Sequence, residues 1–146
     1  MKIRGHHILC MQGFQGKGYD KNFIANMSRL TREITLKPGA MLKVTDECDD
    51  ICASCPYISN NACARTSVSS RETKCMDLKV FRKLGIKKGA AYKAAALFDL
   101  VNEKIKTVSE AEKICGKCEW QAECLWFADR KKKYYKNSKT AYTGER

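Results

Sequence analysis

A helix is the clearest element that the hydrophobic pattern of the chain predicts. Its apolar positions recur three or four residues apart, at Phe23, Ile24, Met27, Leu30 and Ile34. Asp20 can cap the first turn, and Pro38-Gly39 interrupts the pattern. We therefore expect one helix between these two signals.

Further helices are predicted in the second half of the chain. Ser69-x-x-Glu72 is a candidate capping box for a helix that Gly85 would close. Residues 90–105 are rich in alanine and carry apolar residues at helical spacing. Ser109-x-x-Glu112 is a second candidate box, which leads into Cys115.

The remaining segments predict short strands and loops. Residues 41–45 resemble a brief strand, and residues 6–14 read as a strand or a short helix before a turn at residues 16–18. With a small sheet formed near Ile3 and Val44, the fold class expected is α+β, a single compact and mostly helical domain with cysteine-rich metal-binding loops.

The C-terminal residues divide into an apolar part and a basic part. Trp120, Cys124 and Phe127 recur at helical spacing, which places Cys124 inward beside two aromatic rings. Apolar periodicity is absent after Asp129, so we expect a fraying helix end and a mobile tail. The predicted organisation is a cysteine-rich domain over residues 1–129 and a basic tail over residues 130–146.

Nine cysteines in 146 residues indicate metal binding rather than disulfides. The number is odd, the spacings include C-x2-C, and no export signal opens the chain, so we expect a cytoplasmic protein with reduced thiols. No apolar run approaches the ~18 residues that a membrane span needs, so no membrane partner is expected.

The formal net charge of +12 favours an acidic partner such as nucleic acid. Residues 130–146 account for half of this charge, with seven Lys or Arg and one acidic residue. They interleave basic and aromatic residues, namely Lys131, Lys132, Lys133 and Lys136 with Tyr134, Tyr135 and Tyr142. Such a segment is typical of single-stranded nucleic-acid binders and also of solubilising tails.

Cys115-x2-Cys118-x5-Cys124 is the strongest candidate metal motif. Two thiolates on one tight turn and a third nearby can bind three corners of a cubane cluster, and a distant residue must supply the fourth. Cys10 is the candidate for this remote thiolate of one of the loops. The alternative is a buried cluster of cysteines without metal.

A second motif, Cys48-x3-Cys52-x2-Cys55-Pro56, is followed by Cys63. Four thiols within sixteen residues can bind a metal alone, and proline after Cys55 resembles bacterial ferredoxin loops. The spacing also matches radical S-adenosylmethionine enzymes, but the chain is too short for their barrel. Cys75 lies in a predicted helix away from both loops, and we expect it in the core.

His6 and His7 are candidate additional ligands, together with Cys48. Neutral imidazole can ligate a metal or donate a proton beside a cluster, and a structural role is the alternative. Four acidic residues surround Cys48, at Asp46, Glu47, Asp49 and Asp50. They either lower the reduction potential of a nearby cluster or form a solvated acidic turn.

Four short motifs together are similar to those of one bacterial and archaeal family. They are Arg4-Gly5-His6-His7-x2-Cys10, Gly13-Phe14-x-Gly16-x-Gly18-Tyr19, Asp50-Ile51-Cys52 and Cys115-x2-Cys118-x-Trp120. On these motifs the chain resembles domain-of-unknown-function family 1284, whose members are regarded as iron–sulfur proteins. The resemblance implies a ligand set that consists of His6, His7, Cys10, Cys52 and Cys63, extended by Cys55, Cys115, Cys118 and Cys124.

The first functional hypothesis is an iron–sulfur protein with one or two [4Fe-4S] clusters, acting with an unknown redox partner in electron transfer, sensing or sulfur chemistry. The second is a structural zinc module, with Cys52, Cys55, Cys115 and Cys118 as one tetrahedral site. A third is nucleic-acid binding through the basic tail, and a fourth is an enzyme with an open iron beside His7. The motifs assign no reaction.

Overall fold

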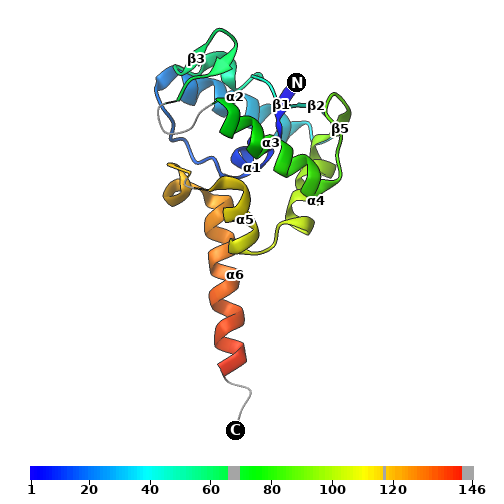
Figure 1. Ribbon diagram of the computed structural model, residues 1–146. Coiled ribbons are helices and arrows are strands. Elements are labelled where there is room, and N and C mark those ends of the chain that lie inside the picture. The colour runs from blue at the N-terminus through cyan, green and yellow to red at the C-terminus, as the bar shows by residue number, and fades with distance from the viewer. Residues whose placement is uncertain (66–69, 117, 143–146) are drawn as a thin grey trace.

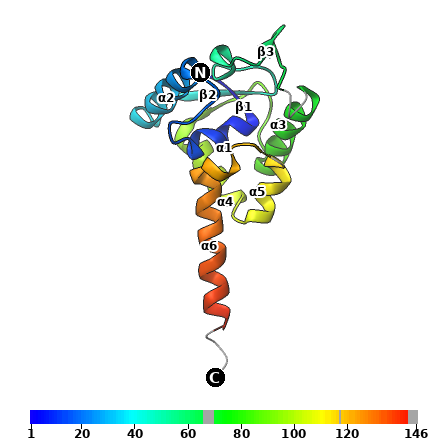
Figure 2. The ribbon, with the colours of Figure 1, turned by 90° about the vertical axis from the view of Figure 1, so that its left-hand side faces the viewer.

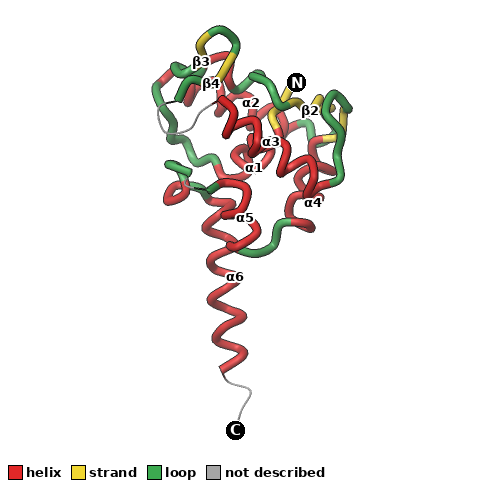
Figure 3. Tube along the Cα trace, viewed as in Figure 1, coloured by secondary structure: helices red, strands yellow, loops and turns green. Residues whose placement is uncertain are grey.

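The chain forms a mixed α+β fold, whose computed structural model describes residues 1–65, 70–116 and 118–142 (Figure 1). Six α-helices occur in this part of the chain: α1 Gly5–Gly13, α2 Lys21–Leu36, α3 Ser70–Leu84, α4 Ala94–Lys104, α5 Val108–Cys115 and α6 Leu125–Tyr142. The strands are short: β1 Lys2–Arg4, β2 Met41–Thr45, β3 Ile58–Ser59, β4 Ala62–Cys63 and β5 Ala91–Lys93 (Figure 3). Two 3-10 turns, η1 Cys52–Ser54 and η2 Gln121–Glu123, complete the order. The expected fold class is confirmed.

The main sheet has the strand order β1-β2-β5. The predicted pairing is confirmed, because Ile3 of β1 lies opposite Val44 of β2 in parallel register. The predicted helix over residues 90–105 is wrong at its start, since Ala91–Lys93 forms β5 antiparallel to β2 and α4 begins at Ala94. Ladder hydrogen bonds to β2 outweigh the helix preference of these residues, which is strong for Ala91 and Lys93.

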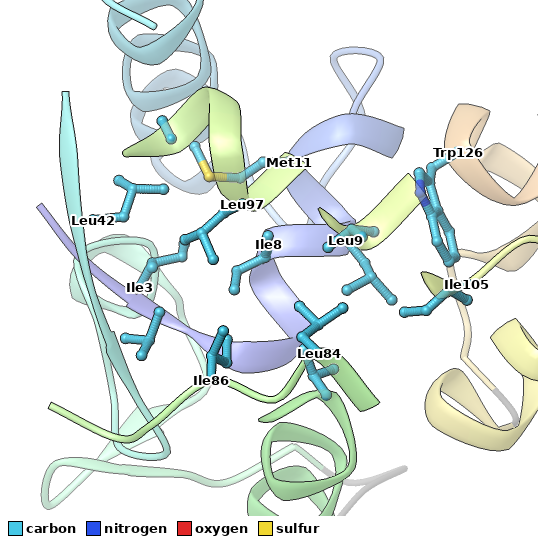
Figure 4. Packing of buried hydrophobic residues seen from close by; sticks show 14 of the residues in the cluster. Ile3, Ile8, Leu9, Met11, Leu42, Leu84, Ile86, Leu97, Ile105 and Trp126 are labelled. Atoms are coloured by element: carbon cyan, nitrogen blue, oxygen red, sulfur yellow. The ribbon is translucent and has the colours of Figure 1, made fainter. Parts of the chain in front are cut away.

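Helix α1 lies at the centre of the molecule and carries Cys10 and both histidines. The segment read as a strand or short helix is the helix, and its Ile8 and Leu9 are fully buried. Figure 4 shows these two side chains between Ile3 on one side and Trp126 on the other. Since α1 contacts α3, α4 and α6, its own side chains are held from several directions.

Two capping predictions have different outcomes. Asp20 caps α2 as expected, accepting a hydrogen bond from the Phe23 amide. The box that opens α5 is Thr107 with Glu110, not the predicted pair at residues 109 and 112. Thr107-x-x-Glu110 fits the same sequence rule two residues earlier. Residue 69, which would begin the other predicted box, lies outside the described residues.

The last helix extends further than the sequence pattern predicts. Cys124 is not on the predicted helical face, because η2 precedes it and α6 begins at Leu125 and runs to Tyr142. Figure 1 and Figure 2 both show α6 projecting away from the body, at the end opposite to β3. Arg130 anchors its base, since the guanidinium stacks on Trp126 and donates to the Ile105 carbonyl. None of the helices in the described part of the chain is long and apolar enough to cross a bilayer.

Helix α3 corrects the prediction for Cys75. The helix buries one face, made of Thr73, Asp77, Val80, Phe81 and Leu84. Cys75 lies on the other face and is exposed. Its helical position was predicted correctly, but two residues from Thr73 or Asp77 correspond to about half a turn, which directs the thiol to solvent.

Candidate metal centre

The first turn of α1 is anchored to a buried carboxylate on α3. Asp77 is fully buried and receives the Arg4 guanidinium at 2.7 Å and His6 Nδ1 at 2.6 Å. A Cβ on Gly5 would lie 2.8 Å from the Asp77 carbonyl oxygen, so only glycine permits this approach of the two helices.

Protonation of this group follows from its surroundings. Burial and the nearby His7 lower the pKa of His6 to about 4, so its ring is neutral at pH 7. Burial acts to raise the pKa of Asp77, but the hydrogen bond from His6 and the charge of Arg4 hold it below its usual value. His6 therefore donates its Nδ1 proton to an ionised carboxylate.

Asp49 holds the ring of His7 through a hydrogen bond to Nδ1, as Asp77 holds the ring of His6. His7 Nδ1 lies 2.8 Å from Asp49 Oδ2, and the same oxygen accepts from the Arg4 amide at 2.6 Å. Asp49 Oδ1 accepts from the amides of Ile51 and Cys52, both at 3.0 Å. One carboxylate thus fixes the His7 ring and the turn that carries Cys52.

The prediction of a solvated acidic turn around Cys48 is wrong for two of the four acidic residues. Asp46 and Asp49 are each only 5% exposed. Asp46 pairs with Lys88 at 2.6 Å, and Asp49 accepts from His7 and from backbone amides. The Lys88 charge compensates that of Asp46, which reduces the negative field that the sequence predicted around Cys48.

A tight hairpin returns the chain from Cys55 to Cys63. Asn60 and Asn61 connect β3 to β4, both with positive φ, as a type I′ hairpin turn requires and asparagine tolerates. Ile58 pairs with Cys63 across the hairpin, and the Ile58 amide donates to the Cys55 carbonyl. The turn thereby brings two distant thiols to the same end of the loop.

The C-terminal cysteines lie against α1. Cys115 ends α5, Cys118 comes in the next turn, and Cys124 immediately precedes α6. A Cβ on Gly13 would meet the Cys124 Sγ atom, so glycine in the last turn of α1 makes room for this thiol. Helix α1 also contacts α6, which begins directly after Cys124.

These segments line one largely apolar cavity of about 150 Å³, which is partly open to solvent. It is lined by the side chains of His6 and His7 and by seven of the nine cysteines: Cys10, Cys52, Cys55, Cys63, Cys115, Cys118 and Cys124. The structure therefore brings together every residue that the sequence put forward as a metal ligand, apart from Cys48. Cys48 and Cys75 are not among the residues that line the cavity in the described part of the chain.

The cavity cysteines fall into groups according to which thiol charges affect the pKa of which neighbours. Burial and then the charges of Cys118, Cys115 and Cys124 raise the pKa of Cys10. Burial and the charges of Cys118 and Cys124 raise the pKa of Cys115 to about 12. The first group is thus Cys10 with the three C-terminal thiols, and burial keeps Cys10 and Cys115 protonated at neutral pH in the metal-free chain.

The other cavity thiols are coupled to different neighbours. Burial and then a charge on Cys63 raise the pKa of Cys55. Burial also acts to raise the pKa of Cys63, but hydrogen bonds from the Arg65 amide and the Thr73 hydroxyl, with the Arg65 charge, lower it below its usual value. Burial and the charge of Asp49 raise the pKa of Cys52.

Arg65 lies between the two groups. Its charge lowers the pKa of Cys10 and Cys118 as well as that of Cys55. It donates to the Tyr19 hydroxyl at 2.8 Å and pairs with Glu119 at 3.3 Å. Arg65 therefore places one positive charge beside thiols from both halves of the chain.

Aromatic rings gather beside the cavity next to Arg65. The Tyr19 ring makes edge contacts with Phe23, Tyr57 and Trp120, at centroid distances of 5.1, 4.9 and 5.2 Å. The Gly-rich turn before α2, the hairpin and the C-terminal loop thus meet at one side chain.

Sequence reasoning missed Asp77 and Arg65. Asp77 left a signal, because a lone aspartate shares the spacing of Thr73, Val80 and Leu84 on the apolar face of α3, where an acidic side chain needs a partner. For Arg65 the sequence offered no signal except its position two residues after Cys63.

The chain matches one family model, Protein of unknown function (DUF1284), over residues 18–124. This range is more than half of the chain. The chain belongs to this family. The match contains every cysteine except Cys10, so that α1, with both histidines, lies outside it. No curated protein and no solved structure matches the chain.

Proposed function

We propose that this protein binds an iron–sulfur cluster through the cavity cysteines and uses the cluster in electron transfer. The observation that carries the proposal is the convergence of seven thiols, from both halves of the chain, on one cavity. Iron–sulfur clusters are held by cysteine thiolates, four for each [4Fe-4S] cluster.

The first group of thiols fits such a cluster. Cys10, Cys115, Cys118 and Cys124 supply four donors, three from a short loop and one from α1. The sequence predicts a remote thiolate for this loop, and we assign Cys10 to that place because it lines the same cavity. Cluster assembly here would displace the thiol protons that burial retains in the metal-free chain.

The cavity is larger than a single metal ion requires. Its volume is about 150 Å³, whereas the four ligands of a structural zinc ion lie only about 2.0–2.3 Å from the metal. This volume favours a cluster over a zinc ion.

Cys55 supports the electron-transfer role. Its side chain lines both the cavity and a shallow polar depression on the surface, where Asn22, Asn26 and Arg29 of α2 also lie. A cluster bound to Cys55 would be one side chain away from this surface. That position offers a redox partner a short path for electrons.

Nucleic-acid binding through the basic tail stays a prediction. Lys131, Lys132 and Lys133 are exposed near the base of α6. The side chains of Tyr134, Tyr135, Lys136 and Tyr142, which the prediction also needs, lie outside the described part.

Metal analysis of protein purified without oxygen tests the proposal. We expect four or eight irons per chain with equal sulfide, little zinc, and absorbance near ~400 nm that bleaches reversibly on reduction. Stoichiometric zinc without sulfide would replace the iron–sulfur proposal with a structural zinc module. Iron and sulfide that cannot be reduced and reoxidised would retain the cluster and remove the electron-transfer role.

A further inference from the structure

We infer that His7 binds iron through Nε2 at a site completed by Cys52, Cys55 and Cys63, with Asp49 orienting its ring. The inference rests on the proposed function, because it assigns a ligand of the cluster that this function requires. It adds a mixed site, with three thiolates and one imidazole, beside the four-thiolate group.

Seven cavity thiols are one too few for two four-iron clusters, so a second cluster would need one further donor. Seven cysteines line the cavity, and Cys10 with the three C-terminal cysteines makes a complete set of four. Cys52, Cys55 and Cys63 remain, one donor short of a four-iron cluster. Cys48 lies near enough to Cys52 for its charge to raise the pKa of that thiol, but Cys48 is not among the residues that line the cavity in the described part of the chain.

His7 is the imidazole that lies in a close group with Cys52, the first thiol of this incomplete set. One ligand atom each from His7, Asp49 and Cys52 lies within 4.8 Å of the other two, which holds for no other such trio of His, Cys, Asp or Glu in the described residues. His7 also lines the cavity, and its side chain is 16% exposed. A ring on α1 thus adjoins the turn that carries the first thiol of the set.

Asp49 is an orienting group rather than a ligand. Its two oxygens accept from three backbone amides and from His7, which occupies the roughly four acceptor positions of a carboxylate. Histidines that bind metals commonly donate their other ring N–H to a carboxylate, which fixes both the tautomer and the ring orientation. With Nδ1 committed to Asp49, Nε2 is the nitrogen left for iron.

His6 is a natural comparison for His7. It is adjacent on α1, and its Nδ1 also bonds a buried carboxylate, that of Asp77. That carboxylate is shared with Arg4 and joins α1 to α3, and the close group with Cys52 contains His7 and not His6. Tyr19, another cavity residue with a donor atom, has its hydroxyl bonded to Arg65 and Glu119.

A histidine ligand changes the electronic properties of the cluster. Neutral imidazole replaces a negative thiolate, so the cluster carries one less negative charge and accepts an electron more readily. The mixed site is therefore the one with the higher reduction potential, and His7→Cys should lower it while retaining iron.

Pulsed electron paramagnetic resonance on the reduced protein tests the inference, because the chain has only two histidines. In protein with ¹⁵N-labelled histidine we expect the strong nitrogen coupling of a directly bound imidazole. His6→Gln should retain this coupling and His7→Gln should lose it. If His7→Gln does not fold, His7→Cys provides the same loss with wild-type iron content.

The outcomes separate this inference from the proposed function. Strong coupling that persists in His7→Gln or His7→Cys, or that disappears in His6→Gln protein with wild-type iron content, would overturn the assignment to His7. Wild-type protein with full iron and sulfide but no histidine coupling would overturn it and leave the proposed function intact. Protein that binds no iron would overturn both.

Discussion

His6 Nδ1 and Asp77 Oδ1 lie 2.6 Å apart and join the first turn of α1 to the buried face of α3. The same carboxylate receives Arg4, so residues at the start of the chain and in its middle depend on one aspartate. This relationship gives the Arg4-Gly5-His6-His7 sequence a structural basis. Arg4 and His6 bind Asp77, Gly5 allows the close approach, and His7 binds Asp49.

Replacing Asp77 should destabilise the fold strongly. Asp77→Ala leaves the buried Arg4 guanidinium without its partner, a change that costs about 3–5 kcal/mol in buried ion pairs. Urea unfolding of wild type and variant measures this loss. Asp99→Ala, on the exposed side of α4, should change the free energy of unfolding by less than about 0.5 kcal/mol. Equal effects of the two substitutions would contradict the role of Asp77.

Gly13 should be required for the metal centre. The methyl group of Gly13→Ala would collide with the Cys124 Sγ atom, so we expect lower iron and sulfide content and a loss of about 1–3 kcal/mol in unfolding free energy. Gly39→Ala is the matched control, because a Cβ there meets nothing within 4 Å. Unchanged iron content in Gly13→Ala would show that Cys124 does not hold the metal.

The sequence predicts an element well where residues close together in the chain determine its structure. It predicts poorly where contacts between distant residues do. The α2 helix has its own cap at Asp20 and its own apolar stripe, and the prediction was right. The three residues of β5 were predicted as helix, because only pairing with β2 makes them a strand. Cysteine spacing grouped the candidate ligands, whereas Arg65 and Asp77 reach the centre through tertiary contacts that spacing does not encode.

The capping box of α5 predicts a pH dependence of stability. Hydrogen bonds from the amides of Thr107 and Lys106, and then from Lys83, lower the pKa of Glu110 to about 2, below an unfolded value near ~4.3. The carboxylate therefore stabilises the fold fully above about pH 5, and this contribution is lost as the pH falls toward 2.

Glu110→Gln should accordingly be less stable than wild type at pH 7, with a difference that shrinks between pH 5 and pH 3. Urea unfolding at each pH measures it. Thr107→Ala removes a hydroxyl that does not titrate, so its deficit should persist at low pH. A Glu110→Gln difference that stays constant across this range would contradict the role of the charged box.

Arg65 should raise the reduction potential of the proposed cluster. Arg65→Gln removes a positive charge beside thiols of both groups, which disfavours adding an electron. We expect iron content to be retained and the midpoint potential to fall by an amount on the order of tens of millivolts, as measured by redox titration. Arg65→Lys keeps the charge and should keep most of the potential. A rise in potential in Arg65→Gln would be the opposite of this expectation.

The central claim is that the cavity thiols, and not the cysteines in general, hold an iron–sulfur cluster. The most direct test compares the iron and sulfide content of Cys118→Ser and Cys75→Ser, both purified without oxygen. Cys118 lines the cavity, whereas Cys75 is exposed on α3. We predict wild-type iron in Cys75→Ser and a marked loss in Cys118→Ser. Equal iron in the two variants, or none in the wild-type protein, would contradict the account.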